Sequence, residues 1–394
     1  MWRAFRALFT AIRADRAAAL LLLVSPLIYA GFYPSAYTDE VVAQAPVLVV
    51  DHDRTSASRN LVVRVEAVQQ THVVASLPSA ADAERWMADG RAVAALVIPE
   101  GFGEEIARGN PGTVLMTGHG AFLLRSSSAL AGIGTALGQT GREAAREQAR
   151  TDGPPAAPAL ALQPRPLFNT REGYGAAIFP GVAFVIVHQS LLLGLALLAG
   201  TARERMGASL HLTRRQLAGI ALAASAIGML DVGWFVGMVF WWHDYPRAAA
   251  PLADVVAGAA LFVAATVAAA LALASLFPTR ERPLQLVLAI SLPLFFLAGL
   301  SWPAEATPTA LVALARLFPT TSGLELMVGL NQMGGRLTDY WPAALNLVLL
   351  TLLFGGFAVW RWTAGTGSGQ GTLSGNPSAL DPDLAVDADK EEAQ

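Results

Sequence analysis

The stretch AAIFPGVAFVIVHQSLLLGLALLAG, residues 176–200, contains no Asp, Glu, Lys or Arg. A helix that crosses the hydrocarbon core of a bilayer needs about 20 mostly apolar residues, so this stretch is long enough to be one. Outward from it, the chain contains further apolar stretches at residues 17–37, 217–242, 254–277, 284–300 and 342–360. The sequence therefore predicts an α-helical bundle of six transmembrane helices, one near the N-terminus and five clustered in the second half.

The composition agrees with a membrane protein. The chain has 394 residues, of which 54% are hydrophobic and 14% charged, whereas soluble domains carry about 25% charged residues. It contains no cysteine, which excludes disulfides and thiolate metal sites. The formal net charge is −3, and the basic residues form short clusters along the chain instead of one basic face. A nucleic acid is therefore not an expected partner.

The segments between the apolar stretches differ in arginine content, which predicts their orientation. Short segments rich in Arg and Lys stay on the cytoplasmic side, whereas long segments cross regardless of charge. Both termini are therefore predicted to be cytoplasmic, in a bacterial inner membrane, and residues 38–175 to be periplasmic or extracellular. A cleaved signal peptide is the alternative for residues 17–37, but the small residues at 43–45 lie well past the apolar stretch. The predicted inner segments hold Arg3, Arg6, Arg13, Arg16, Arg203, Arg205, Arg214, Arg215, Arg280, Arg282 and Arg361, and the short outer ones hold Arg247, Arg316 and Arg336.

Residues 38–175 have the pattern of a soluble domain. Strands are expected at 46–50, 71–75, 92–98 and 113–117, and helices at 56–67 and 80–89, which together indicate a small α/β domain. A long helix at 126–150 and a Pro- and Ala-rich linker at 151–166 are expected to lead back to the membrane. Asp51, His52 and Asp53 follow the first strand. Because polar residues follow most strands, no metal is expected there.

The two ends of the chain are not expected to cross the membrane. Residues 1–16 place Trp2, Phe5, Leu8, Phe9 and Ile12 on one helical face, as in an amphipathic helix that lies along the bilayer surface. Residues 363–394 are rich in Gly and Ser and then acidic, with too few apolar residues to fold. We assign no function to this tail.

The chain lacks the motif needed to hydrolyse ATP. A phosphate-binding loop has the form G-x-x-x-x-G-K-[ST], in which the lysine reaches the β- and γ-phosphates. The one lysine of the chain is Lys390, in the tail. The sequence also contains neither a nucleophile-elbow motif nor an H-E-x-x-H motif. The chain is not expected to be an enzyme, and it contains no candidate catalytic residue and no candidate metal ligand set.

Three sets of motifs resemble those of the ABC type-2 transporter permease family, over nearly the whole chain. The first is VLVVD at 47–51, with the apolar strand at 92–99 and GFG at 101–103. The second is QSLLL at 189–193, which runs into RERMG at 203–207. The third and most specific is GLSWP at 299–303, LFPTTSG at 317–323 and LNQMG at 330–334. The layout is most similar to that of exporter permeases with a large outer domain after the first span.

The resemblance implies that ATP is bound by one kind of subunit and that cargo crosses the membrane through another. The chain itself binds no cofactor, and a separate cytoplasmic ATP-binding subunit carries ATP and Mg²⁺. A second permease, either an identical copy or a paralogue, completes a dimer in the lipid bilayer. Cargo such as drug-like or lipidic amphiphiles is moved outward, and a periplasmic adaptor is a further expected partner.

The resemblance also implies a coupling turn after the second span, formed by Arg203, Glu204, Arg205 and Gly207. The charged residues are suited to contacts with an ATP-binding subunit. The alternative is that they are solvated residues of the cytoplasmic face. The turn, residues 203–215, is shorter than in the commoner family pattern, which bears on how an ATPase docks.

Polar residues inside the predicted spans are candidates for contacts within the bundle or with cargo. A lone carboxylate in a span costs about 2.5 kcal/mol or more, so Asp231 is expected to face the bundle interior or a wet cavity. It either pairs with His188 on the neighbouring span, binds a proton or contacts cargo. His188 and Gln189 are positioned to form hydrogen bonds between helices.

Residues 303–341 are too polar to span, and in the family this region resembles an outer gate. Short helices are expected at 311–318 and 324–330, broken at Pro319 and Gly323. The side chains either line an exit or cap helices and hold loops. The candidate gate residues are Pro303, Pro319, Thr320, Gly323, Glu325, Asn331 and Gln332.

Two other classes of protein compete with the permease hypothesis. A receptor or adhesion protein with an outer binding domain needs only one or two spans, and five clustered spans argue against it. A proton-driven secondary transporter centred on Asp231 usually has two related sets of spans, and a one-plus-five layout does not.

Overall fold

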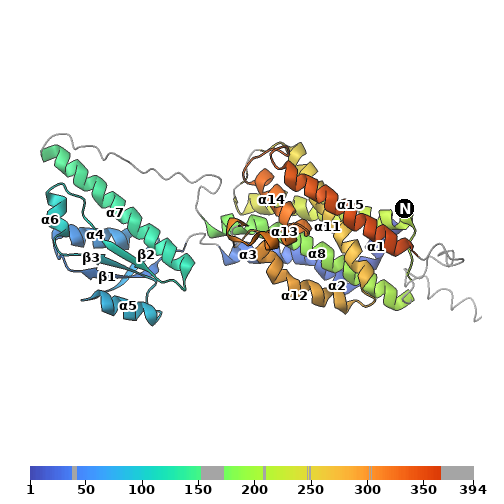
Figure 1. Cartoon of the computed structure of the whole chain (residues 1–394), viewed down its shortest axis with the longest axis horizontal. Coiled ribbons are helices and arrows are strands. Elements are labelled where there is room, and N and C mark those ends of the chain that lie inside the picture. The colour runs from blue at the N-terminus through green and yellow to red at the C-terminus, as the bar shows by residue number, and fades with distance from the viewer. Residues whose placement is uncertain are drawn as a thin grey trace, which may run out of the picture. The chain divides into compact units, whose positions relative to one another are not determined.

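The computed structural model describes residues 1–37, 42–151, 173–206, 210–245, 247, 250–300, 302 and 304–364. The chain divides into two compact units (Figure 1). Met1–Thr38 and Pro166–Gln394 form a helical unit, and Asp39–Arg165 form an α/β unit between them in sequence.

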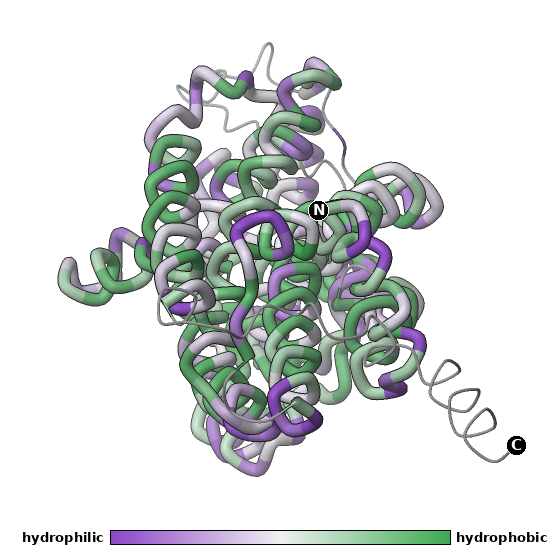
Figure 2. Tube along the Cα trace, turned by 90° about the vertical axis from the view of Figure 1, so that its right-hand side faces the viewer, coloured by the Kyte–Doolittle hydropathy of each residue, from purple (hydrophilic) through white to green (hydrophobic). Residues whose placement is uncertain are grey.

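The helical unit contains the apolar stretches. Within the described residues, five helical runs are long and apolar enough to cross a membrane, or six if one bent helix pair is counted. Figure 2 shows that hydrophobic residues make up most of these helices, while hydrophilic residues lie mostly at helix ends and connections. The five runs are Arg16–Ala36, Tyr174–Met206, Arg214–Trp242, Leu252–Leu276 and Trp341–Thr363.

Helix α8 (Tyr174–Met206) is the central helix of this unit. It contacts α3 (Ser25–Ala36), α11 (Leu252–Leu276), α12 (Glu281–Leu297) and α14 (Pro319–Asn331). In its most apolar 18-residue stretch, 89% of the residues are buried. This is expected for a helix that is hydrophobic on every face. The remaining elements are α1 (Trp2–Ala14), α2 (Arg16–Ala19), η1 (Leu20–Val24), α9 (Arg214–Gly233), η2 (Trp234–Val239), α10 (Phe240–Trp242), η3 (Ala304–Ala306), α13 (Thr309–Ala315) and α15 (Trp341–Thr363).

Two predicted elements differ from the structure. The stretch predicted to span at 284–300 is α12, which has 17 residues, fewer than the roughly 20 that a straight crossing needs. The break predicted at Gly323 does not form, because α14 continues through this residue. A Cβ at Gly323 would lie 2.2 Å from a ring carbon of Phe262, so the glycine permits close packing on α11. The bend, 85°, lies between α13 and α14.

The α/β unit contains the predicted strands and helices. The sheet order is β2-β1-β3-β4, with β4 antiparallel to β3 and the other pairs parallel. Helices α4 and α7 cover one face and α5 covers the other (Figure 1). The elements are β1 (Ala45–Asp51), α4 (Ser56–Ala67), β2 (Thr71–Ser76), α5 (Ala80–Ala88), β3 (Ala94–Ile98), α6 (Phe102–Ala107), β4 (Leu115–Gly118) and α7 (Leu123–Thr151).

The polar residues after β1 shape the turn into α4. Asp51 accepts hydrogen bonds from the backbone N–H groups of Asp53 and Arg54, at 3.0 and 2.9 Å. The Asp53 carboxylate accepts the N–H of Gly103 at 3.1 Å, which ties this turn to the start of α6. The carboxylates are therefore used in turn and cap hydrogen bonds. Among the described residues, no group of three or more His, Asp or Glu side chains is arranged to hold a metal ion.

Candidate functional site

One end of the helical unit gathers the arginines Arg203, Arg205, Arg280 and Arg361, and we call it the basic end. Arg203 and Arg205 lie in the last turn of α8, Arg361 lies in the last turn of α15, and Arg280 precedes α12. Helix α11 also ends here, and its last carbonyl groups lack partners within the helix. The basic end is therefore where the ends of several apolar helices meet.

Arg203 joins three of these helices. Its guanidinium donates hydrogen bonds to the carbonyls of Ala274 and Phe277 and, at 3.3 Å, to that of Ser275. It also lies over the ring of Trp362 in α15, 4.3 Å from the ring centre. A cation over an aromatic face is attracted by the electron-rich ring. Arg203 thus caps α11 and fixes it to α8 and α15.

A second set of contacts joins α8 to the turn before α12. The backbone N–H of Arg280 donates to the Glu204 carboxylate at 3.0 Å. At Gly200 the two backbones approach so closely that a Cβ would lie 2.4 Å from Cα of Arg280. This end of α8 is therefore in direct contact with the turn that leads into α12.

Asp15 connects the N-terminal helices to the same place. It is buried between α1 and α2 and caps α2 by accepting the N–H groups of Ala17 and Ala18. Its Oδ2 atom accepts the Thr201 hydroxyl at 3.0 Å, and a guanidinium nitrogen of Arg280 lies 3.6 Å from Oδ1. An ion pair at a buried carboxylate is costly to break, so α1 and α2 are held to the end of α8.

These contacts show where the predicted coupling residues lie. Arg203 is half-buried, and its guanidinium is bound to backbone carbonyls at the end of α11. Glu204 is exposed but holds Arg280. Arg205 remains exposed and lines a small pocket with Met206 and residues of α1. Gly207 lies outside the described residues.

The sequence interpretation missed Asp15, Thr201 and Arg280. Asp15 was detectable in principle, because it is the one acidic residue among the four arginines of residues 1–16. A lone acid in a basic segment is a candidate partner for a basic group. Thr201 and Arg280 gave no such signal, since a threonine and one more inner arginine are ordinary residues at a helix end.

Of the alternatives left open for Asp231, a pair with His188 does not form. His188 is buried and shares a hydrogen bond of 3.1 Å with the Thr266 hydroxyl on α11. Asp231 lies near the end of α9, and its Oδ2 atom is buried without a hydrogen-bond partner. One turn further along, Nε1 of Trp234 is also buried and unpartnered. Gln189 is half-buried on α8.

Asp231→Leu is expected to raise the melting temperature of the purified protein. The substitution removes a carboxylate oxygen that has no partner, and a charge in a span costs about 2.5 kcal/mol or more. Thermal unfolding in detergent measures the effect, with Asp254→Leu as the control, because Asp254 accepts the backbone N–H of Leu337 and its loss is expected to destabilise. A lower melting temperature for Asp231→Leu would show that the carboxylate is stabilised within the chain.

Six of the seven candidate gate residues lie on α14 or cap its end. Pro319 is the first residue of α14, Thr320, Gly323, Glu325 and Asn331 lie along it, and Gln332 caps its end. Thr320, Asn331 and Gln332 are buried, and each has a side-chain polar atom without a partner, whereas Glu325 is exposed. Pro303 lies outside the described residues. Buried polar groups normally have partners, so α14 carries an unusual set of unpaired groups.

Apolar helices of membrane-spanning length, with an α/β unit after the first of them, define a polytopic α-helical membrane protein. The family model of the ABC-2 family transporter protein matches residues 18–360. The chain therefore belongs to this family of ABC transporter permeases, whose members work with an ATP-binding partner subunit. A search of curated proteins gives no match to the sequence.

Proposed function

We propose that the chain is the membrane subunit of an exporter that is driven by ATP hydrolysis on separate subunits. The observation that carries this proposal is the junction at the basic end, where α8 is fixed to α11, α15, the turn before α12 and the N-terminal helices. A force applied to the end of α8 is passed to all of them. A permease that lacks its own ATPase requires such a connection.

The proposed mechanism places the basic end in the cytoplasm, as the arginine distribution favours. ATP and Mg²⁺ bind to the partner subunits, which close and push on the exposed Arg205 and on the turn that follows it. Because Arg203 and Gly200 hold the neighbouring helices to α8, the helix ends move together. The bundle then changes between two arrangements, and cargo leaves on the side of the α/β unit.

We also propose a dimeric assembly and an amphiphilic cargo. Two permeases, identical or paralogous, form the dimer, and a periplasmic adaptor is a candidate partner of the α/β unit. The unpaired groups on α14 support contacts with a cargo that has both polar and apolar parts, such as a drug-like or lipidic amphiphile. Asp231 is a second candidate contact for such a cargo. Family membership favours this function over the receptor and proton-driven alternatives.

Arg205→Glu is expected to weaken binding of the ATP-binding subunit without unfolding the chain. Arg205 is exposed and forms none of the junction's hydrogen bonds, so charge reversal acts on the outside contact. Arg247→Glu is the control, because Arg247 is also exposed and lies in a segment predicted to be on the other side. Co-purification of the two subunits is the measurement. Equal recovery with both variants would remove Arg205 from the docking surface, and no recovery even with the native chain would contradict the proposed function.

A further inference from the structure

The edge of the sheet at which β1 begins is connected to the membrane by a short segment, and we call it the tethered edge. Residues 37–44, eight in all, separate Ala36 at the end of α3 from Ala45 at the start of β1. An extended chain of that length reaches about 30 Å at most. Since Arg16–Ala36 is a membrane-spanning run, a bilayer surface is always within reach of the tethered edge.

The turn between β4 and α7 lies at this same edge. Val47, Ala94 and Gly118 are in register across β1, β3 and β4. One residue further out, Pro46 accepts the N–H of Val93, and Val93 accepts the N–H of His119. The residues that follow His119 therefore extend past the sheet on the side where the chain enters from α3.

The end of this turn and the first residues of α7 expose three consecutive large apolar side chains. Phe122, Leu123 and Leu124 are 44%, 73% and 47% exposed. Clustered exposed apolar side chains of this kind mark contact surfaces. Arg125 follows directly and is also exposed. An apolar group followed by an arginine suits a bilayer surface, where the apolar part enters the acyl region and the guanidinium stays among the phosphates.

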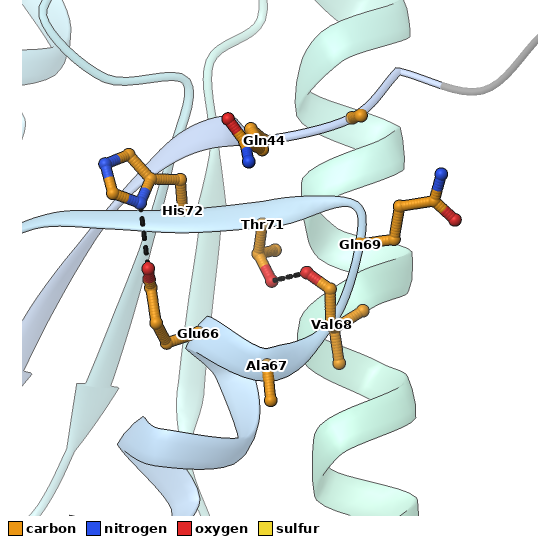
Figure 3. A pocket seen from close by; sticks show the side chains of 8 residues that line it. Gln44, Glu66, Ala67, Val68, Gln69, Thr71 and His72 are labelled. Atoms are coloured by element: carbon orange, nitrogen blue, oxygen red, sulfur yellow. Dashed lines mark hydrogen bonds and ion pairs between the residues drawn. The ribbon is translucent and has the colours of Figure 1, made fainter. Parts of the chain in front are cut away.

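Other residues at the tethered edge are polar and suited to the headgroup layer. A pocket near the start of β1 and β2 is lined by Gln44, Glu66, Gln69 and His72 among others (Figure 3). The Glu66 carboxylate accepts the N–H of Val73 and lies 2.9 Å from Nδ1 of His72. These two contacts lower the pKa of the Glu66 carboxyl, so Glu66 stays ionised at lower pH than an isolated carboxyl does.

The opposite edge of the sheet also exposes charged and apolar residues. The segment after β3 and the start of α6 exposes the acidic residues Glu100 and Glu104. Glu104 forms an ion pair with the exposed Arg108, so this edge carries charges of both signs, as the tethered edge does with Glu66 and Arg125. Leu115 and Met116 are also exposed near the opposite edge, but only the tethered edge exposes three consecutive large apolar residues that are followed directly by an arginine.

We propose that Phe122, Leu123 and Leu124 insert into the surface of the bilayer that the chain spans, so that the α/β unit rests on lipid through its tethered edge. A second copy of the chain is the competing occupant of this patch. The bilayer is favoured because the short connection to α3 keeps it within reach in every copy. The proposal does not depend on cargo or on the direction of transport.

The absence of cysteine from the sequence allows a direct test. Leu123→Cys, labelled with the fluorophore NBD, is compared with Leu115→Cys in full-length protein in phosphatidylcholine vesicles that contain nitroxide-labelled lipid. Leu115 is the matched control because it is 58% exposed and is paired with Val97 near the opposite edge of the sheet. Phe122→Cys provides a second insertion site.

The expected result is that nitroxide lipid removes most of the NBD fluorescence at position 123 and little of it at 115, while iodide in the water quenches 115 more strongly. Strong iodide quenching at both positions, with no effect of nitroxide lipid, would overturn the proposal. Protection from both quenchers at 123 would also overturn it and would assign the patch to a protein contact. Insertion is expected at position 122 as well.

Discussion

Arg203→Ala is expected to destabilise the chain by about 2–4 kcal/mol, the combined size of hydrogen bonds from a charged donor and of a cation over an aromatic ring. The substitution leaves carbonyls at the end of α11 without partners and removes the group that stacks on Trp362. Thermal unfolding of the purified protein and the yield of folded protein from membranes both report the effect.

Arg203→Lys is expected to restore little of this stability. A lysine ammonium keeps the charge but lacks the planar fork that reaches several carbonyls at once. Arg205→Ala is the control, since Arg205 is exposed in the same turn of α8. If Arg203→Ala and Arg205→Ala unfold at the same temperature, Arg203 does not hold the junction together.

Gly200→Val is expected to separate α8 from the turn before α12 and to prevent normal folding. A Cβ at this position would lie 2.4 Å from Cα and 2.7 Å from N of Arg280. Because these are backbone atoms, a side-chain rotation cannot relieve the clash, and overpacking typically costs about 1–3 kcal/mol or more. The yield of monodisperse protein after size-exclusion chromatography measures the outcome.

Gly233→Val is the matched control for this substitution. Gly233 lies at the end of α9, and a Cβ there has no atom within 4 Å. The two variants introduce the same side chain into an apolar helix, so a difference between them reports the close contact at Gly200 alone. Normal folding of both would mean that the end of α8 and the turn before α12 are not in close backbone contact.

Most of the helical architecture was predictable from the sequence, because span length and apolar content leave few alternatives. The stretch at 176–200 became the centre of α8, and the alternation of strands and helices after residue 45 became the α/β unit. The least reliable prediction concerned Gly323. Glycine weakens an isolated helix, but here it allows α14 to lie against Phe262, and such a tertiary contact leaves no local signal.

The candidate site was predictable in place but not in detail. The charged residues at the end of α8 mark the basic end, yet their order along the chain does not show which side chain turns inward. Arg203 turns toward the carbonyls of α11, whereas Arg205, two residues later, is exposed. Likewise, polarity made a pair of Asp231 and His188 one of the alternatives, but His188 shares its hydrogen bond with Thr266 instead. Partner choice among buried polar groups depends on helix rotation, which composition does not fix.

ATP hydrolysis in the presence and absence of this chain is the most direct test of the proposed function. We would reconstitute the chain and its ATP-binding subunit in vesicles, with Arg205→Glu and Arg247→Glu as the paired variants. The expected result is that hydrolysis by the subunit rises when the native chain or Arg247→Glu is present, and falls back with Arg205→Glu. Hydrolysis that is the same with the native chain as without it would contradict an ATP-driven permease.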